Sequence, residues 1–150
     1  MAKANQVNLL RCSFPSYSAN EALARAVAAS FTAQMNPTCE EVSDIKCAVS
    51  EAVTNAIVHG YRDTLGEIVM ILKLTDDRMF TAEVRDRGAG IENVEEAMRP
   101  LFTTDPENER SGMGFTIIEN FMDSLRVVSS PGRGTRVIMK KKLSMLPLSK

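Results

Sequence analysis

The sequence has few of the residues that usually mark metal sites or disulfide frameworks. Its 150 residues include no tryptophan, two tyrosines, one histidine and three cysteines. Cys12, Cys39 and Cys47 form no CxxC motif and cannot all pair with one another. We therefore predict reduced thiols that pack in the fold and bind no metal, as is usual in a reducing compartment.

The chain also lacks an excess of charge and a long apolar run. Eighteen basic and nineteen acidic residues give a net charge of -1, too weak a field to attract nucleic acid or an anionic membrane. The longest apolar run, Ile68 to Leu72, is far shorter than the roughly 20 residues of a membrane span, and no signal-peptide pattern precedes it. We expect a cytoplasmic protein with no membrane partner and no direct nucleic-acid partner.

The composition that remains is that of a globular domain. Hydrophobic residues make up 44% and charged residues 25% of the sequence, and its length suits one domain with a sizeable core. No repeat or low-complexity segment divides it. We therefore expect residues 1–150 to form a single domain.

Periodicity predicts which segments are helices and which are strands. Capping-box patterns at Ser18–Glu21 and Thr38–Glu41 begin two predicted helices, the first ending before Pro37 and the second at Gly60. In the first helix the apolar positions recur every fourth residue: Leu23, Val27, Phe31 and Met35. Strands are predicted at 7–14, 68–74 and 80–86, a third long helix after Gly114, and a hairpin at 125–129 and 135–140. This order predicts an α+β fold, a two-layer sandwich whose mixed, mostly antiparallel sheet has helices on one face.

Glu51 and Asn55 lie one turn apart on the second helix, beside its apolar stripe. Polar groups at the margin of a core need partners, which a ligand could supply. The Asn55 amide oxygen suits Mg²⁺, and Glu51 could take a proton from a nucleophile that attacks a phosphate. A hydrogen-bonded pair at a helix edge is the alternative. His59 fits a packing or capping role better than a catalytic one.

Asp86-Arg87-Gly88-Ala89-Gly90 follows a strand whose inward-facing positions include Asp86. A buried carboxylate needs donors, and the exocyclic amine of a purine would be one. The two glycines would let the backbone turn and pass close to a flat ring. The alternative is an ordinary solvated Asp-Gly turn.

Gly112-Met113-Gly114 precedes a helix, where free N–H groups favour phosphate. By itself a Gly-x-Gly is weak evidence, because a loop entering a helix can use glycine for its geometry alone. The sequence contains no Walker A motif, no GxGxxG and no HRD or VAIK motif. ATP, if bound, would be held by another scheme.

In this order, the Glu51/Asn55 helix, the Asp86 motif, the Gly-x-Gly and the final Gly134-Thr135 strand resemble the N, G1, G2 and G3 boxes of the GHKL (Bergerat-fold) ATP-binding superfamily. More closely, the segments 50–57, 59–61, 100–104, 109–116 and 119–123 resemble the anti-sigma F factors of spore-forming bacteria. The resemblance covers most of the chain. One departure from related histidine kinases is Val58, where those enzymes often carry Lys or Arg near phosphate.

The resemblance implies a serine-protein kinase that uses Mg²⁺ and ATP, releases ADP, and acts as a homodimer. Such a protein would hold a sporulation sigma factor (sigma F) inactive and phosphorylate a serine of an anti-anti-sigma factor. The implied general base is Glu51 and the implied Mg²⁺ ligand is Asn55. Implied nucleotide contacts are Asn55, Asp86, Gly88, Gly90, Arg110, Ser111, Gly112, Met113, Gly114 and Thr135. Arg25 and Arg110 would contact partner proteins, the loop at about 94–111 would close as a lid, and residues 1–14 would add a strand at the dimer interface.

Two alternatives remain open at this point. One is an ATP-gated protein-binding module without kinase activity. The other is a detached ATPase domain of a histidine kinase, which the position of the sole histidine, His59, inside the nucleotide helix disfavours.

Overall fold

The structure is a computed structural model of the chain and describes residues 3–99 and 114–145. Five strands form one sheet in the order β1-β2-β3-β5-β4: β1 (Gln6–Pro15), β2 (Glu67–Thr75), β3 (Met79–Asp86), β5 (Thr135–Lys142) and β4 (Ser124–Ser129). All four pairings between these strands are antiparallel. The sheet, expected to be mostly antiparallel, has no parallel pair within the described residues.

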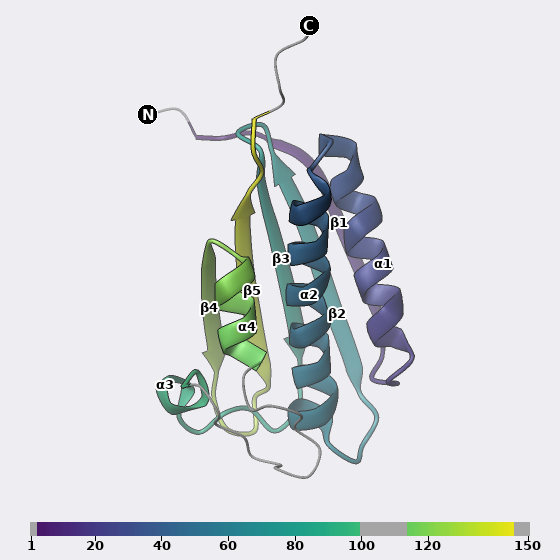
Figure 1. Cartoon of the computed structure of the whole chain (residues 1–150). Helices are drawn as coiled ribbons and strands as arrows, with labels where there is room; N and C mark the ends of the chain where they lie inside the picture. Colours follow the sequence, from purple (N-terminus) through teal and green to yellow (C-terminus); the bar gives the residue numbers. More distant parts are fainter. Residues whose placement is uncertain (1–2, 100–113, 146–150) are drawn as a thin grey trace, which may run out of the picture.

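The helices cover one face of this sheet, which confirms the predicted α+β sandwich (Figure 1). They are α1 (Asn20–Thr32), α2 (Cys39–Asn55) and α4 (Gly114–Phe121), with a short 3₁₀ turn at Ala33–Met35 after α1. A π-helical turn, η2 (Ala56–Tyr61), continues α2, and the four-residue α3 (Val94–Ala97) lies beside the end of β4. None of the described helices combines the length and apolarity needed to cross a membrane.

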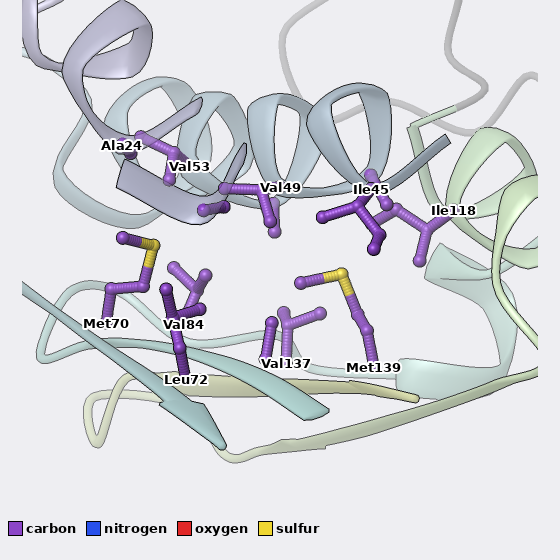
Figure 2. Close-up of a cluster of buried hydrophobic side chains, with 14 of the residues drawn as sticks. Ala24, Ile45, Val49, Val53, Met70, Leu72, Val84, Ile118, Val137 and Met139 are labelled. Atoms are coloured by element: carbon purple, nitrogen blue, oxygen red, sulfur yellow. The ribbon is translucent and has the colours of Figure 1, made fainter. Parts of the chain in front are cut away.

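The core lies between α2 and the sheet. Ile45 and Val49 of α2 face Val137 and Met139 of β5 (Figure 2), and all four side chains are buried. On β3 the alternation predicted from sequence is confirmed, because every second residue is buried from Phe80 to Asp86. Only Asp86 in that series is polar, so its strand delivers a carboxylate to the inner face of the sheet.

One of the two predicted capping boxes is present. At the start of α2 the Glu41 N–H donates to the Thr38 hydroxyl at 3.1 Å, and the Thr38 N–H donates to the Glu41 carboxylate at 2.8 Å. The Ser18 box predicted for α1 is wrong, because α1 has no side-chain cap. The Glu21 carboxylate accepts instead from the Ser50 hydroxyl of α2.

The buried face of α1 also differs from the prediction. Leu23 is 50% exposed, whereas Ala24, Ala28 and Phe31 are buried. Alanine lets the axis of α1 approach α2 and the sheet more closely than leucine would. The helix therefore turns its small side chains toward the core and leaves the larger Leu23 side chain at the surface. The third predicted helix is shorter than expected, with α4 spanning eight described residues.

A run of three lysines, Lys140–Lys142, suggests a strand end that faces solvent, but one of the three side chains is mostly shielded from it. The Lys141 side chain is only 13% exposed, and its ammonium lies 3.3 Å from the Asp44 carboxylate. The same ammonium donates to the Phe121 carbonyl at the end of α4 at 2.8 Å. A cation at a helix C-terminus is favourable, so Lys141 holds α4 to both β5 and α2.

Lys141→Met should therefore destabilise the fold. The substitution keeps a long apolar side chain but leaves the half-buried Asp44 carboxylate and the Phe121 carbonyl without this donor. We expect the free energy of unfolding to fall by about 1–3 kcal/mol, the range for buried polar groups that lose a partner. Urea denaturation followed by circular dichroism measures this. Lys140→Met at the exposed neighbouring position is the control and should change the free energy by less than about 0.5 kcal/mol; equal effects would contradict the role of Lys141.

Candidate functional site

A cavity of about 740 Å³ opens at the end of the sheet where β3 ends and β5 begins. Its volume lies within the roughly 300–1,000 Å³ typical of ligand pockets. The walls come from the last turns of α2 and η2, the loop after β3, α3 and the first residues of α4. Lining residues with polar side chains are Asn55, His59, Arg62, Asp86, Glu92, Asn93, Glu96 and Thr135.

Asp86 is the buried carboxylate of this cavity. It is 9% exposed, and its Oδ1 accepts the Gly88 N–H at 2.9 Å. Burial raises the pKa of the Asp86 carboxyl above its ordinary value, and hydrogen bonds from the backbone of Gly88 and Thr135 oppose that rise only in part. The carboxylate is thus held in a fixed orientation with little water around it, and it remains able to accept a further donor.

The π-helical turn η2 brings the backbone of α2 against Asp86. A Cβ added to Gly60 would lie 2.8 Å from Asp86 Oδ1, so only glycine lets the chain pass this close. The Gly60 carbonyl then accepts the Ala89 N–H at 2.8 Å. The prediction that Gly60 stops the helix is corrected. Helical geometry continues to Tyr61, and the residue that leaves it is Arg62, with a positive φ of 52°.

The two glycines of the Asp86 motif have different surroundings. A Cβ on Gly88 would meet the Gly60 carbonyl oxygen at 2.0 Å, so Gly88 packs on the backbone of η2. Gly90 has a φ of 74°, and a Cβ there would meet the Ser130 carbonyl oxygen at 2.0 Å. Gly90 lines the cavity, whereas Gly88 is not among the lining residues. Both keep the loop close to its neighbours.

Asn55 and Gly114 meet at the other end of the cavity, and Glu51 lies beside them. A Cβ on Gly114 would lie 3.1 Å from Asn55 Nδ2, 3.2 Å from Asn55 Oδ1 and 3.5 Å from Glu51 Oε2. Glu51 and Asn55 are half-buried, as their predicted place at the edge of the core requires. The start of α4 therefore lies directly against the acid and the amide of α2, and Asn55 and Gly114 both line the cavity.

Thr135 completes the end of the cavity that contains Asp86. The register of the sheet pairs Asp86 with Thr135, and Thr135 is buried. Its hydroxyl lies 2.8 Å from the Ser129 hydroxyl. Ser129 also accepts the Ile91 N–H at 2.8 Å, which ties the loop after β3 to the β4–β5 hairpin.

Some predicted residues lie elsewhere. Arg25 is on α1, away from the cavity lining, where its guanidinium lies 3.6 Å from the Glu21 carboxylate. Arg110, Ser111, Gly112 and Met113 are outside the described residues, as is most of the predicted lid. The start of that segment contains the helical turn α3, which Asn93 caps by accepting the Glu96 N–H at 3.0 Å.

Several lining residues were not predicted as site residues, among them His59, Arg62 and Asn93. His59 follows Asn55 by one helical turn, so the spacing that linked Glu51 to Asn55 could have placed it on the same wall. Asn93 lies three residues after Gly90 in a loop already assigned to the site. The sequence gives no indication that Arg62 lines the cavity, because its position depends on η2 continuing past Gly60.

The described residues contain no group of three or more histidine, cysteine, aspartate or glutamate side chains that could hold a metal. Mg²⁺ differs, because it is commonly held by one or two protein oxygens together with phosphate and water. The Asn55 amide oxygen, at the wall of the cavity and against Gly114, is chemically suited to that kind of site.

Comparison with known proteins defines the class of this domain. Residues 14–141 match the family model of the histidine kinase-like ATPase domain. In a crystal structure of the RsbU and RsbW domains of a Mycobacterium tuberculosis protein, a similar fold has a TM-score of 0.68 at 22% identity, and the match covers 93% of this chain and 34% of that one. The chain therefore belongs to the GHKL-type ATPase domains, a nucleotide-binding class.

The sequence relatives are more specific. An anti-sigma F factor of Clostridium acetobutylicum is 52% identical over 139 residues, covering 93% of this chain and 96% of the relative. An anti-sigma F factor of a Thermoanaerobacter species is 54% identical over 134 residues, covering 89% and 93% of the two chains. The chain belongs to the anti-sigma F factor family, which confirms the resemblance found in its motifs.

Proposed function

We propose that this protein binds and inhibits a sigma F-type sporulation sigma factor, and that it uses Mg²⁺ and ATP to phosphorylate a serine of an anti-anti-sigma protein. The observation that supports this proposal most strongly is that the polar residues expected to bind ATP lie around one cavity, in a chain of the anti-sigma F factor family. The buried Asp86 carboxylate lies at one end of the cavity, and the Asn55 amide and the start of α4 at Gly114 meet at the other, with the Glu51 carboxylate beside them.

The two ends of the cavity suit the two ends of ATP. Asp86 offers an acceptor to the adenine amine, with Thr135 beside it and Gly90 lining the same wall. The phosphates would extend toward Asn55 and Gly114, where N–H groups at the start of α4 favour negative charge. Arg110, Ser111, Gly112 and Met113 would add contacts from the segment just before Gly114.

The proposed reaction is an in-line phosphoryl transfer. The serine oxygen forms a bond to the γ-phosphorus while the bond from that phosphorus to the β–γ bridging oxygen breaks, and ADP leaves. Glu51 accepts the serine proton, since it is the acidic side chain of α2 that lies beside Asn55 and Gly114. Phosphoryl transfer depends mainly on positioning and charge stabilisation, so a base held at a rigid helix suffices. Mg²⁺, when bound through Asn55, would neutralise phosphate charge.

The loop at about 94–111 would close over the nucleotide as a lid. If its contacts differ between ATP and ADP, the nucleotide would set the affinity for protein partners, because a ligand shifts an equilibrium only through a difference in affinity for the two states. This coupling predicts different sigma-factor affinities in the two nucleotide states. Equal affinities, measured by titration with each nucleotide at saturation, would refute it.

We infer that the functional unit is a homodimer formed through β1. This strand is an edge strand of the sheet, and its N-terminal half carries the exposed apolar side chains Val7 and Leu9. A long edge strand of this kind is a natural site for pairing with another strand. Residues 1–150 would then be a single kinase domain in each subunit.

Arg25→Ala should separate partner binding from nucleotide binding. Arg25 is proposed to contact the partner protein together with Arg110, and it lies outside the cavity. Arginine is enriched among the few interface residues whose truncation costs about 2 kcal/mol or more, so we expect sigma-factor affinity to fall about tenfold or more while ATP affinity is unchanged. Arg126→Ala is the control, because Arg126 is an exposed cation on β4 at the opposite edge of the sheet. A loss of ATP binding in Arg25→Ala would contradict the assignment.

One experiment tests the proposed activity directly. The protein is mixed with γ-labelled ATP, Mg²⁺ and an anti-anti-sigma protein, and label on that protein is measured before and after acid treatment. Acid-stable label is the expected result for phosphoserine. Acid-labile label would indicate a histidine-kinase domain. Absence of label, with ATP binding intact, would indicate an ATP-gated binding module.

A further inference from the structure

Tyr61 lies behind the wall of the cavity and does not line it. It is the last residue of η2, it is 9% exposed, and its ring packs on Gly66, where an added Cβ would lie 2.1 Å from Tyr61 Cε1. Its hydroxyl accepts the Arg87 N–H at 2.8 Å and donates to the Glu67 carbonyl. Tyr61 does not line the cavity, but it is hydrogen-bonded to Arg87, the residue that follows Asp86.

The hydroxyl occupies the point where β2 and β3 separate. The antiparallel register pairs Val69 with Arg85, and the same register continued by two residues would bring Glu67 opposite Arg87. The paired residues end before that point. There the Tyr61 hydroxyl stands between the Arg87 N–H and the Glu67 carbonyl as a bridge. The bridge lets the chain after β3 separate from β2 while the Arg87 N–H keeps a hydrogen-bond partner.

Three consecutive N–H groups after Asp86 are consequently all satisfied by different acceptors. The Arg87 N–H is bonded to Tyr61, the Gly88 N–H to Asp86 itself at 2.9 Å, and the Ala89 N–H to the Gly60 carbonyl at 2.8 Å. Two of these acceptors belong to the adjacent residues Gly60 and Tyr61. The turn that orients the Asp86 carboxylate is therefore bonded to η2 at two positions, Arg87 and Ala89, on either side of Gly88.

We infer that Tyr61 is a positioning residue for purine recognition, acting through the backbone of Arg87 on the Asp86 carboxylate. This inference rests on the proposed function of the cavity. The phosphate end of the cavity, formed by Asn55 and Gly114, involves none of these bonds. Loss of the Tyr61 hydroxyl should therefore weaken recognition of the base and leave recognition of the phosphates unchanged.

Tyr61→Phe removes only the hydroxyl, and Tyr17→Phe is a matched control, because Tyr17 is the other tyrosine of the chain and is 54% exposed. Calorimetric titration should show that Tyr61→Phe weakens ATP and ADP by the same factor, about tenfold, as expected for one lost hydrogen bond that fixes an acceptor. Binding of tripolyphosphate with Mg²⁺ should be unchanged, as should the stoichiometry for ATP. In the phosphotransfer assay, KM for ATP should rise while kcat is retained.

The outcomes separate this inference from the proposed function. Unchanged ATP affinity in Tyr61→Phe, with the parent protein binding ATP normally, would overturn the role of Tyr61 alone. Equal weakening of ATP and tripolyphosphate, or a reduced stoichiometry at unchanged affinity, would show a merely structural role and would also overturn it. Failure of the parent protein itself to bind ATP would instead overturn the proposed function on which the inference rests.

Discussion

Asp86→Asn should lose most of its affinity for ATP and ADP and yet fold normally. In the parent protein, Asp86 accepts the Gly88 N–H and a backbone hydrogen bond from Thr135, and it is proposed to accept the adenine amine as well. If the asparagine oxygen keeps the hydrogen bond from Gly88, the new NH₂ group would face the Thr135 N–H and the adenine amine. All of these groups are donors, so no hydrogen bond could form between them. A hydrogen bond to a charged group is worth about 1.5–3 kcal/mol, so we expect nucleotide affinity to fall about 10- to 150-fold.

The same substitution should change how the stability of the unliganded protein depends on pH. Burial raises the pKa of Asp86 in the folded protein above its unfolded value of 3.8. Between those two values the folded state binds more protons than the unfolded state, so this group's contribution to stability is fully present below the unfolded pKa and is lost as the pH rises through the folded pKa. Asparagine does not ionise and so avoids the burial of a charge.

The measurement compares the two proteins without nucleotide from acidic to neutral pH. The difference in free energy of unfolding, Asp86→Asn minus parent, should shift in favour of the variant as the pH rises. Using a difference removes the contributions of Glu41 and Glu83, whose pKa values are lowered and whose pH dependence has the opposite sign. Asp63→Asn, on the exposed turn after η2, is the control and should change neither affinity nor this slope. Normal ATP binding by Asp86→Asn would contradict the purine role.

Glu51→Gln should abolish most phosphotransfer while ATP remains bound. Glu51 lies beside Asn55 and Gly114, where we propose that it acts on the incoming serine. It is not a lining residue of the cavity, so we expect it to contribute little to holding the nucleotide. Glutamine keeps the size and polarity of the side chain but cannot accept the proton. Loss of a general base typically lowers the rate about 10²- to 10⁴-fold, and we expect kcat to fall by that factor.

Asn55→Ala provides the contrast to Glu51→Gln. Asn55 lines the cavity and is the proposed Mg²⁺ ligand, so its loss should weaken binding of Mg²⁺ and ATP and raise KM. Glu119→Gln, at an exposed position of α4, is the control for removal of a glutamate charge and should leave both constants unchanged. Normal transfer by Glu51→Gln would show that the base is another group, even if the cavity binds ATP as proposed.

The arrangement of Asp86, Glu51 and Asn55 could be predicted because it follows from local periodicity. Alternation along β3 places Asp86 on the inner face whichever strands flank it, and the helical period places Glu51 and Asn55 on one line of α2. Thr135 shares its phase with Val137 and Met139 for the same reason, and the structure shows all three buried. Each of these statements needs only the geometry of one element and the direction of the core.

Competition between partners distant in the sequence could not be predicted in this way. Glu21 has the spacing of a capping box, but Ser50 of α2 is brought close enough to take its carboxylate instead. Lys141 stands in a run of lysines typical of a solvated strand end, but Asp44 and the end of α4 surround it. In both cases the side chain could make two different interactions, and the packing of α2 decides between them.

By itself the sequence determined the α+β order, the inner face of each main element and the polar residues delivered to it, because these depend on periods of two and 3.6 residues. Only the tertiary structure decided that α2 continues as a π-helical turn to Tyr61, that Gly60 lies against the Asp86 carboxylate, and that a tyrosine hydroxyl bridges β2 and β3. The physical reason is that a π-helical turn and a strand separation each leave backbone groups unpaired. They are stable only where distant parts of the chain supply the missing partners.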